Sequence, residues 1–314
     1  MILLKNDCEK GEGVDLRKQY EVRVYPTFAM VNGAGEVTAR WAGYPGVEEF
    51  GALVDAALGD MRTIAEKQAA YEEWPTLALA LGLARHAESV FATEDAVRYF
   101  RKAMALDPDL AADLRVDVFM AMGYGLRSGA FTVDDLAAEA RIILAAPDVD
   151  PTDALRVALM SSRFLPDEAY RPLLEKALAA TANLEGDDER NARRALEIDA
   201  ALLIDGDAEK ALDLKRQSLP EGWRDDPSQL NGFAWWCFEN DLNLAEAFTL
   251  AMRGVDLAES DGDRANILDT AAEIAFKRGE AARAVELQER AVALNPDREA
   301  FKEKLARFRE ALDS

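Results

Sequence analysis

Histidine, cysteine and long apolar runs are scarce in this 314-residue chain. His86 is the only histidine, so a serine or cysteine nucleophile would have no other histidine to act as its base. Its place late in a predicted helix, near an end where a cation is favourable, favours a surface histidine. The two cysteines, Cys8 and Cys237, lie far apart in different predicted modules and make neither a disulfide framework nor a metal set, which favours two unreactive thiols. No apolar run is long enough to span a membrane.

Acidic residues outnumber basic ones, 59 to 37, which gives a net charge of −22. Residues 1–60 contribute −4 (6 − 10) and the remaining chain contributes −18. Because such a surface repels phosphate backbones and anionic lipids, we expect no nucleic acid and no membrane as a partner. The acidity is explained by solubility, and a basic peptide or protein partner is the alternative.

Motifs for cofactors and metals are missing as well. The sequence has no phosphate-binding glycine loop, zinc motif or dinucleotide fingerprint. The carboxylates of residues 148–153 lack the glycine and the distal glutamate of a calcium loop, so they are interpreted as a loop and helix cap. We therefore expect no cofactor, no metal and no catalytic residue in this chain.

The first 60 residues are predicted to form a small α/β unit. The turn residues Asn32-Gly33-Ala34-Gly35 predict a hairpin between two apolar strands. An amphipathic pattern follows, with Phe50, Leu53 and Val54 among its apolar positions. The expected order is strand, helix, strand, strand and helix at residues 2–4, 15–20, 22–31, 36–42 and 47–58.

Pro26 stands inside one of these strands, where a proline cannot donate a hydrogen bond and indicates an edge or a bulge. The segment Tyr25-Pro26-Thr27-Phe28, the hairpin after it and Gly43-Tyr44 resemble the C-terminal half of a thioredoxin domain. The resemblance implies a cis Tyr25–Pro26 bond. It also implies that Tyr25 offers its backbone to an extended peptide and that Thr27 begins the buried strand. The substrate-binding residues that it implies are Tyr25, Pro26 and Thr27.

The Cys-x-x-Cys helix and the central strand of that family are missing from the sequence. Without the central strand, the flanking strands lose hydrogen-bond partners, and a buried unpaired group costs about 1–3 kcal/mol. Either the two strands pair directly, or the first strand is loose, or the sequence is a fragment of a longer protein. We expect the fragment.

Residues 60–314 are predicted to be helical throughout. Two segments, 77–108 and 268–296, resemble tetratricopeptide repeats, because small residues such as Ala84, Ala103 and Ala271 lie where paired helices approach and a proline ends each unit. The closing prolines, Pro108 and Pro296, are 296 − 108 = 188 residues apart, which divides into five steps of 37 to 38.

Periodicity predicts four more helix pairs between these two repeats. A capping box at Thr132 and Asp135 and a glycine stop at Gly206 support the spacing. A last helix with Phe301, Leu305 and Phe308 is expected to cap the array. The predicted pairs are 112–127 with 133–146, 151–163 with 167–182, 188–204 with 207–217, and 228–239 with 243–258.

The predicted fold class is therefore mostly α: an incomplete thioredoxin-like module over residues 1–59, then an α-solenoid of tetratricopeptide-like hairpins over 60–314. Such arrays bind peptides or proteins in a groove. The inner-helix positions Asn266, Asp269 and Glu273 of the last repeat, and Leu81 and Arg85 of the first, would make a poor carboxylate clamp. The aromatic run of residues 233–238 is expected to pack in the core and against the next repeat.

The leading functional hypothesis is a non-catalytic protein-interaction scaffold that holds a protein or peptide in its groove. The alternative is a fragment of a thiol-disulfide oxidoreductase whose dithiol half is absent. Residues 1–5 are too short for the apolar part of a signal peptide, so the expected location is cytoplasmic. On the fragment hypothesis it becomes periplasmic or otherwise extracytoplasmic. The oligomeric state is left open.

Overall fold

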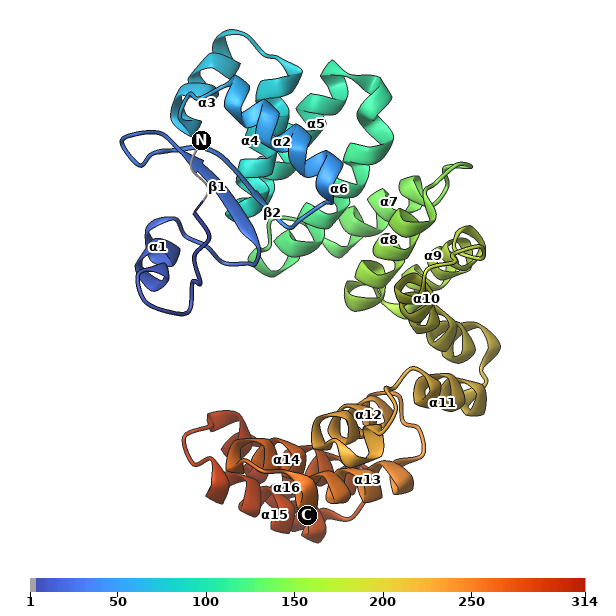
Figure 1. Cartoon of the computed structure of the whole chain (residues 1–314). Coiled ribbons are helices and arrows are strands. Elements are labelled where there is room, and N and C mark those ends of the chain that lie inside the picture. The colour runs from blue at the N-terminus through green and yellow to red at the C-terminus, as the bar shows by residue number, and fades with distance from the viewer. Residues whose placement is uncertain (1–3, 314) are drawn as a thin grey trace. The chain divides into compact units, whose positions relative to one another are not determined.

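The hairpin predicted near the N-terminus is present in the computed structural model, which describes residues 4–313 (Figure 1). It joins β1 (Thr27–Val31) to β2 (Val37–Ala42) in antiparallel register, with Phe28 opposite Trp41. The side-chain oxygen of Asn32 accepts hydrogen bonds from the N–H groups of Ala34 and Glu36, at 2.9 and 3.0 Å. The predicted hairpin is therefore confirmed, and Gly35 in its turn has φ +82°.

β1 is shorter than predicted, because it begins at Thr27 and not at residue 22. Pro26 has no N–H to donate to a ladder, and the hydroxyl of Thr27 donates to the carbonyl of Val24 at 2.7 Å. The Tyr25–Pro26 bond is cis, as predicted. Of the strand expected at 2–4, residues 2 and 3 lie outside the described residues, and Leu4 has no regular structure.

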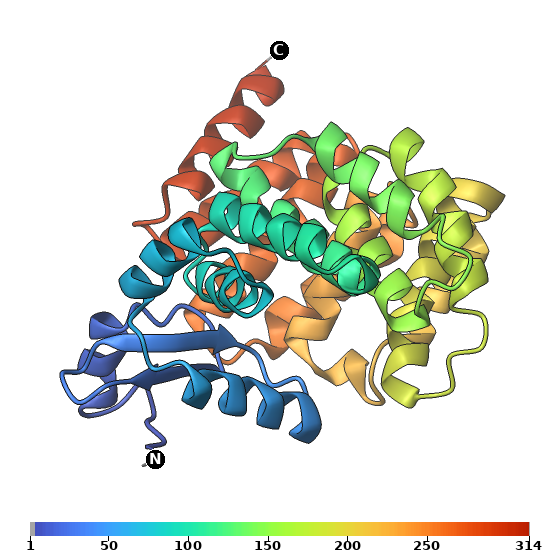
Figure 2. The ribbon, with the colours of Figure 1, turned by 90° about the horizontal axis from the view of Figure 1, so that it is seen from above.

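Two helices accompany the sheet, close to their predicted bounds: α1 (Gly13–Gln19) and α2 (Val47–Gly59). α2 packs on the sheet through Phe50, whose ring centroid lies 4.8 Å from that of Phe28 and 5.9 Å from that of Trp41. Figure 2 shows this helix beside the two strands. The edge of β2 is tied to the next helix, α3 (Ile64–Glu73), by a 2.6 Å hydrogen bond from Lys67 Nζ to the carbonyl of Thr38.

Helices form the rest of the described chain, and consecutive helices pack against each other over residues 64–180 and 227–313. Three of the four predicted helix pairs are confirmed, since α6 packs on α7, α8 on α9 and α12 on α13, while the pair at 188–204 and 207–217 stays a prediction. Neighbouring pairs stack, since α12 also packs on α14 and α6 on α8. The mostly α fold and the α-solenoid arrangement are therefore as predicted. After α3 the helices are α4 (Leu77–Ser89), α5 (Thr93–Leu106), α6 (Ala111–Gly125), α7 (Val133–Ile143), α8 (Pro151–Phe164), α9 (Asp167–Ala180), α10 (Asp187–Ala200), α11 (Ala208–Gln217), α12 (Pro227–Glu239), α13 (Leu244–Leu257), α14 (Asp261–Lys277), α15 (Ala281–Leu294) and α16 (Glu299–Asp313).

Left-handed residues mark five of the turns between helices, at steps close to one repeat length or, once, to two. They are Phe91, Gly129, Gly206, Asp241 and Gly279, and the steps between them are 38, 77, 35 and 38 residues (129 − 91, 206 − 129, 241 − 206, 279 − 241). In four of the five, the next residue donates its N–H to the carbonyl five residues earlier, the hydrogen bond that closes a Schellman turn. This spacing is an internal repeat in backbone conformation, which the residue types alone do not show.

The chain divides into two compact units, Met1–Leu196 (unit 1) and Glu197–Ser314 (unit 2), with the division inside α10. This division differs from the boundary between residues 59 and 60 that the sequence predicts. That boundary stays a prediction. In unit 1 the core includes Leu83, Phe100 and Phe119. In unit 2 the predicted capping helix is confirmed, since α16 buries Phe301 and Phe308.

Helix caps follow the sequence signals. Thr132 and Asp135 form a reciprocal capping box at the start of α7. Asp150 caps α8 by accepting from the N–H groups of Thr152 and Asp153, so the run of carboxylates at 148–153 is a loop and a cap. Among residues 4–313, no helix combines the length and the apolar character needed to cross a membrane.

Candidate binding groove

Unit 1 contains a groove of about 940 Å³. It lies between the sheet with α2 on one side and α4, α6 and α8 on the other. Ligand sites commonly have volumes of this size and a mostly apolar lining. Six of its larger apolar lining residues are Trp41, Leu53, Leu77, Leu81, Leu114 and Val116.

The sequence of α4 explains one wall of the groove. Residues four apart share a helix face, so Leu77, Leu81 and Arg85 line the groove together. Leu83, on the opposite face of the helix, is buried in the core. The hydroxyl of Thr76 accepts the N–H of Leu79 at 3.3 Å and caps the helix where this wall begins.

Charged side chains stand around the apolar lining, and several are already paired. Arg85 contacts Asp117 at 3.0 Å and Glu88 at 3.3 Å. Burial lowers the pKa of the Arg85 guanidinium, but these two carboxylates outweigh burial and the pKa is raised. Asp153 is paired with Arg156 at 3.2 Å. Among the described charged lining residues of α4, α6 and α8, only Asp113 has no ion-pair partner.

The wall formed by β2 and α3 is different, because its cations have no carboxylate partner. Arg40 is 3% exposed and donates to the carbonyls of Tyr20 and, at 2.9 Å, Glu21. Lys67 is 5% exposed and donates to the carbonyl of Thr38. Burial lowers the pKa of both side chains. Among the described residues, no carboxylate lies within 4.0 Å of either cation.

The residues predicted from the thioredoxin resemblance lie outside this groove. Tyr25 is 55% exposed, and the carbonyl of Pro26 accepts a hydrogen bond from the N–H of Gly43 at 2.9 Å. None of Tyr25, Pro26 and Thr27 is among the lining residues. Sequence reasoning had named Leu81 and Arg85 as inner-helix positions, and both do line the groove.

Two of the inner positions named for the last repeat, Asp269 and Glu273, are buried and already paired. Lys304 of α16 contacts Asp269 at 2.7 Å, and Arg307 contacts Glu273 at 2.5 Å. Gln288 also donates to Asp269 at 2.9 Å. Ion pairs with α16 therefore already engage the carboxylates of Asp269 and Glu273.

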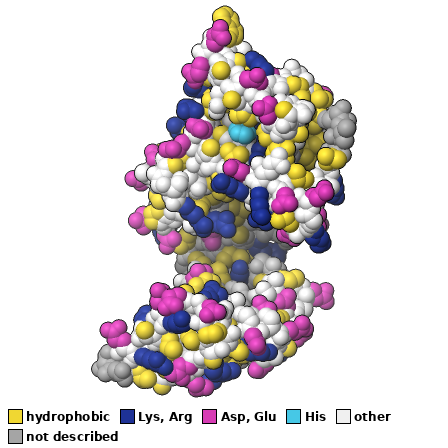
Figure 3. Space-filling view, turned by 90° about the vertical axis from the view of Figure 1, so that its left-hand side faces the viewer, with side chains coloured by type: hydrophobic (Ala, Val, Ile, Leu, Met, Phe, Trp, Pro, Cys, Tyr) yellow, Lys and Arg dark blue, Asp and Glu magenta, His cyan; other side chains and the backbone are white. Residues whose placement is uncertain are grey.

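His86, predicted to be a surface histidine, is half-buried and part of its side chain is visible in Figure 3. Its Nδ1 atom is buried and has no hydrogen-bond partner among residues 4–313. Burial lowers the pKa of the imidazole, and the nearby cations Arg40 and Lys67 lower it further. Helical periodicity alone did not show this, because α4 packs against β2, which comes from a distant segment.

The aromatic run of α12 packs in unit 2 as expected. Phe233 and Cys237 are fully enclosed, while Trp236 and Phe238 pack against the same core. Lys304 Nζ lies 5.8 Å from the ring centroid of Trp235. Burial raises the pKa of the Cys237 thiol to about 12, so this cysteine is a poor nucleophile.

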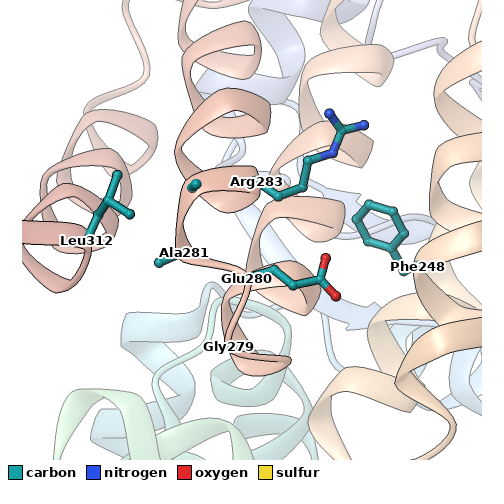
Figure 4. A pocket seen from close by; sticks show the side chains of 7 residues that line it. Phe248, Gly279, Glu280, Ala281, Arg283 and Leu312 are labelled. Carbon is teal, nitrogen blue, oxygen red and sulfur yellow. The ribbon is translucent and has the colours of Figure 1, made fainter.

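Unit 2 has a smaller hollow of about 520 Å³ beside the turn between α14 and α15. Glu280 and Arg283 point toward Phe248 of α13, and Leu312 lies on the other side of α15 (Figure 4). Both charged groups are already paired, Glu280 with Arg278 at 2.8 Å and Arg283 with Glu286 at 2.5 Å. The hollow therefore offers fewer free groups to a ligand than the groove of unit 1.

Acidic and basic side chains are interspersed over the face shown in the space-filling view (Figure 3). Many of the basic residues are paired, as in Arg216 with Glu246 at 2.6 Å and Arg253 with Asp225 at 2.6 Å. Among the described residues, no group of three or more histidine, cysteine, aspartate or glutamate side chains is placed to hold a metal ion.

No protein-family model matches the sequence, and no curated protein matches it. Several solved structures align with it. A tetratricopeptide repeat protein from Parabacteroides merdae is 14% identical, with a TM-score of 0.48, over 83% of this chain and 94% of that one. The APC/C hetero-tetramer Cut9-Hcn1 is 13% identical, with a TM-score of 0.44, over 78% and 45%.

A third alignment is with YrrB, described as a TPR protein with an unusual peptide-binding site. It is 17% identical, with a TM-score of 0.33, over 76% of this chain and 96% of that one. Because all three TM-scores lie below 0.5, the hairpin arrangement rests on the helix contacts of this chain itself.

Proposed function

We propose that this chain is a non-catalytic interaction scaffold that binds a segment of a protein partner in the groove of unit 1. The observation that carries the proposal is the groove itself, with its open apolar lining and its surrounding charges. A fully buried leucine or phenylalanine side chain contributes about 1.5–3 kcal/mol. Two such anchors, set against Leu53 and Leu81, would offset the cost of ordering a short peptide.

The charges of the groove favour a polypeptide over a purely apolar ligand. Glu49 on α2 and Asp113 on α6 line the groove and have no cation within 4.0 Å among the described residues. Arg40 and Lys67 lie on the wall formed by β2 and α3. A partner segment with charges of both signs would be oriented by these groups, since charge complementarity fixes register and suppresses wrong partners.

A second candidate site is the segment of Tyr25, Pro26 and Thr27, as part of a thioredoxin-like module. The observation that favours it is the exposed Tyr25, whose main-chain N–H and C=O form no hydrogen bond with other described residues. An extended peptide could pair with these groups by strand addition. The thiol-disulfide alternative finds less support, because Cys237 is buried with a raised pKa and Cys8 has no second cysteine nearby in the sequence.

The groove proposal is tested by selecting peptides and then altering one lining residue. Random 12-residue peptides displayed on phage are selected on the immobilised chain, and the tightest is synthesised with a fluorophore. Its affinity is measured by fluorescence polarisation for the wild type, for Leu81→Glu and for Leu58→Glu. Leu58 is an exposed residue of α2 outside the groove, so Leu58→Glu makes the same chemical change as a control.

We expect Leu81→Glu to weaken binding by about 10-fold or more, since a lost apolar contact of about 1.4 kcal/mol is tenfold in affinity. Leu58→Glu should bind within about twofold of the wild type. Circular dichroism establishes that both variants keep their helices. The proposal fails if no peptide is enriched, or if Leu81→Glu binds as tightly as the wild type.

A further inference from the structure

Two buried cations without a carboxylate partner are unusual in a folded protein, and unit 1 places both beside one groove. Arg40 on β2 and Lys67 on α3 both line the groove, and both are nearly inaccessible to solvent. Burying a charge is costly unless it is paired and hydrogen-bonded. Carbonyl oxygens satisfy part of their hydrogen-bonding capacity but supply no opposite charge.

Unused hydrogen-bond donors remain on the same wall. The Nε atom of Arg40 is buried without a partner among residues 4–313, and so is the indole Nε1 of Trp41. Trp41 is 5% exposed and lines the groove. An ammonium group has three N–H donors, and Lys67 has one hydrogen bond, to Thr38, in the structure.

The charges around these donors leave an excess of positive charge. The charges that act on the Arg40 guanidinium are one negative, Glu21, and one positive, Arg23. Lys67 is influenced by Asp60 and Arg62, and Asp60 is already engaged by Arg62 at 2.8 Å.

His86 lies close enough to Arg40 and Lys67 for both cations to lower its pKa. An anion that accepts hydrogen bonds from Arg40 and Lys67 would gain charge-assisted hydrogen bonds, which are about twice as strong as neutral ones.

We propose that the wall formed by Arg40, Trp41 and Lys67 binds a carboxylate carried by the partner segment. This inference rests on the proposed function and adds the chemistry of the bound segment to it. The carboxylate is either an acidic side chain or the end of the partner chain. A single negative charge suits the site better than a phosphate dianion, because Glu49 and Asp113 also line the groove and the chain carries a net charge of −22.

Two small probes of the same shape isolate this charge. They are 4-methylpentanoate, a carboxylate with a leucine-like tail, and 4-methylpentanamide, its neutral counterpart. Each is titrated into the full chain at constant ionic strength. The indole N–H resonance of Trp41, assigned by its loss in Trp41→Phe, reports binding by NMR, and so does the side-chain nitrogen of Lys67.

We expect the carboxylate to bind about 10-fold or more tightly than the amide and to shift both resonances. Lys67→Met keeps the length of the side chain but removes the charge, so the two probes should bind it almost equally. Trp41→Phe keeps the ring contacts with Phe28 and Phe50 and should lose a few-fold in carboxylate affinity. Arg23 is an exposed cation outside the groove, so Arg23→Gln removes one positive charge as a control. This variant should still bind the carboxylate more tightly than the amide.

Equal binding of the two probes to the wild type would overturn the carboxylate inference and leave the groove proposal intact. If the NMR shifts reach saturation with neither probe, the carboxylate inference is overturned as well. The peptide selection would then still test the groove proposal. If Lys67→Met does not fold, the wild-type comparison and Trp41→Phe remain decisive. With a selected peptide, amidating its C-terminus or changing its glutamates to glutamine identifies which carboxylate binds.

Discussion

Gly279 and Gly232 allow one chemical change to be tested in two backbone conformations within unit 2. Gly279 lies in the turn between α14 and α15 with φ +81°, and Gly232 lies inside α12. At both positions a Cβ atom would meet nothing within 4 Å. Any effect of a glycine-to-alanine change therefore comes from the backbone and not from a steric clash.

The expected effects have opposite signs. A left-handed conformation costs an L-residue about 1–2 kcal/mol, so Gly279→Ala should destabilise unit 2 by about that amount. Gly232→Ala should stabilise it by about 0.5–1 kcal/mol, because alanine favours a helix interior. Both changes restrict the unfolded chain equally, so this contribution cancels when the two variants are compared.

Urea unfolding followed by tryptophan fluorescence measures both effects. Three of the five tryptophans, Trp223, Trp235 and Trp236, lie in unit 2. With a urea dependence of about 2 kcal/mol per molar, the midpoints should move by about 0.5–1 M down for Gly279→Ala and about 0.25–0.5 M up for Gly232→Ala. Shifts of the same sign would refute the assignment of Gly279 to a left-handed turn.

Three further predictions follow from single residues. His86 has the one imidazole of the chain, and its NMR titration should give a pKa below the usual 6.5. Lys67→Met should raise this pKa because a neighbouring cation is removed. A titration midpoint above 6.5 would contradict the burial of the imidazole. Because the folded protein holds the pKa of this imidazole below 6.5, its contribution to stability should be lost as pH falls from 6.5 to the lower pKa of the folded state. At pH 8 only about one in ten thousand Cys237 thiols is ionised. Alkylation of the folded protein, followed by mass spectrometry, should therefore modify Cys8 before Cys237, and equal alkylation rates at the two cysteines would count against a buried Cys237 thiol. Thr132→Ala should cost about 1 kcal/mol of unfolding free energy by removing the cap of α7, and an unchanged melting curve would speak against that cap.

Local signals in the sequence predicted most of the helical array. Alanines at helix contacts, such as Ala84 and Ala103, and the prolines that follow the hairpins gave helix bounds within a few residues of those observed. The capping box at Thr132 and the stop at Gly206 were recognisable for the same reason, since a cap depends on residues close in sequence. Phe91 and Asp241 take the same turn conformation as Gly279 but carry no glycine signal.

The groove could not be predicted in the same way. Arg40 and Lys67 are 27 residues apart (67 − 40), on a strand and a helix that the tertiary fold brings to one wall. A charged residue inside an apolar strand, as at Arg40, was the available signal, but its burial depends on what packs over the strand. The thioredoxin resemblance directed attention to Tyr25 instead, which lies outside the groove.

The central claim is that a partner segment occupies the groove of unit 1, and photocrosslinking locates that segment directly. A selected peptide carrying a benzophenone group is irradiated with the full chain, and the attachment sites are mapped by mass spectrometry. The account predicts attachment to β2, α2, α4 and α6, and loss of attachment in Leu81→Glu but not in Leu58→Glu. Attachment confined to unit 2, or to the segment around Tyr25, would contradict it.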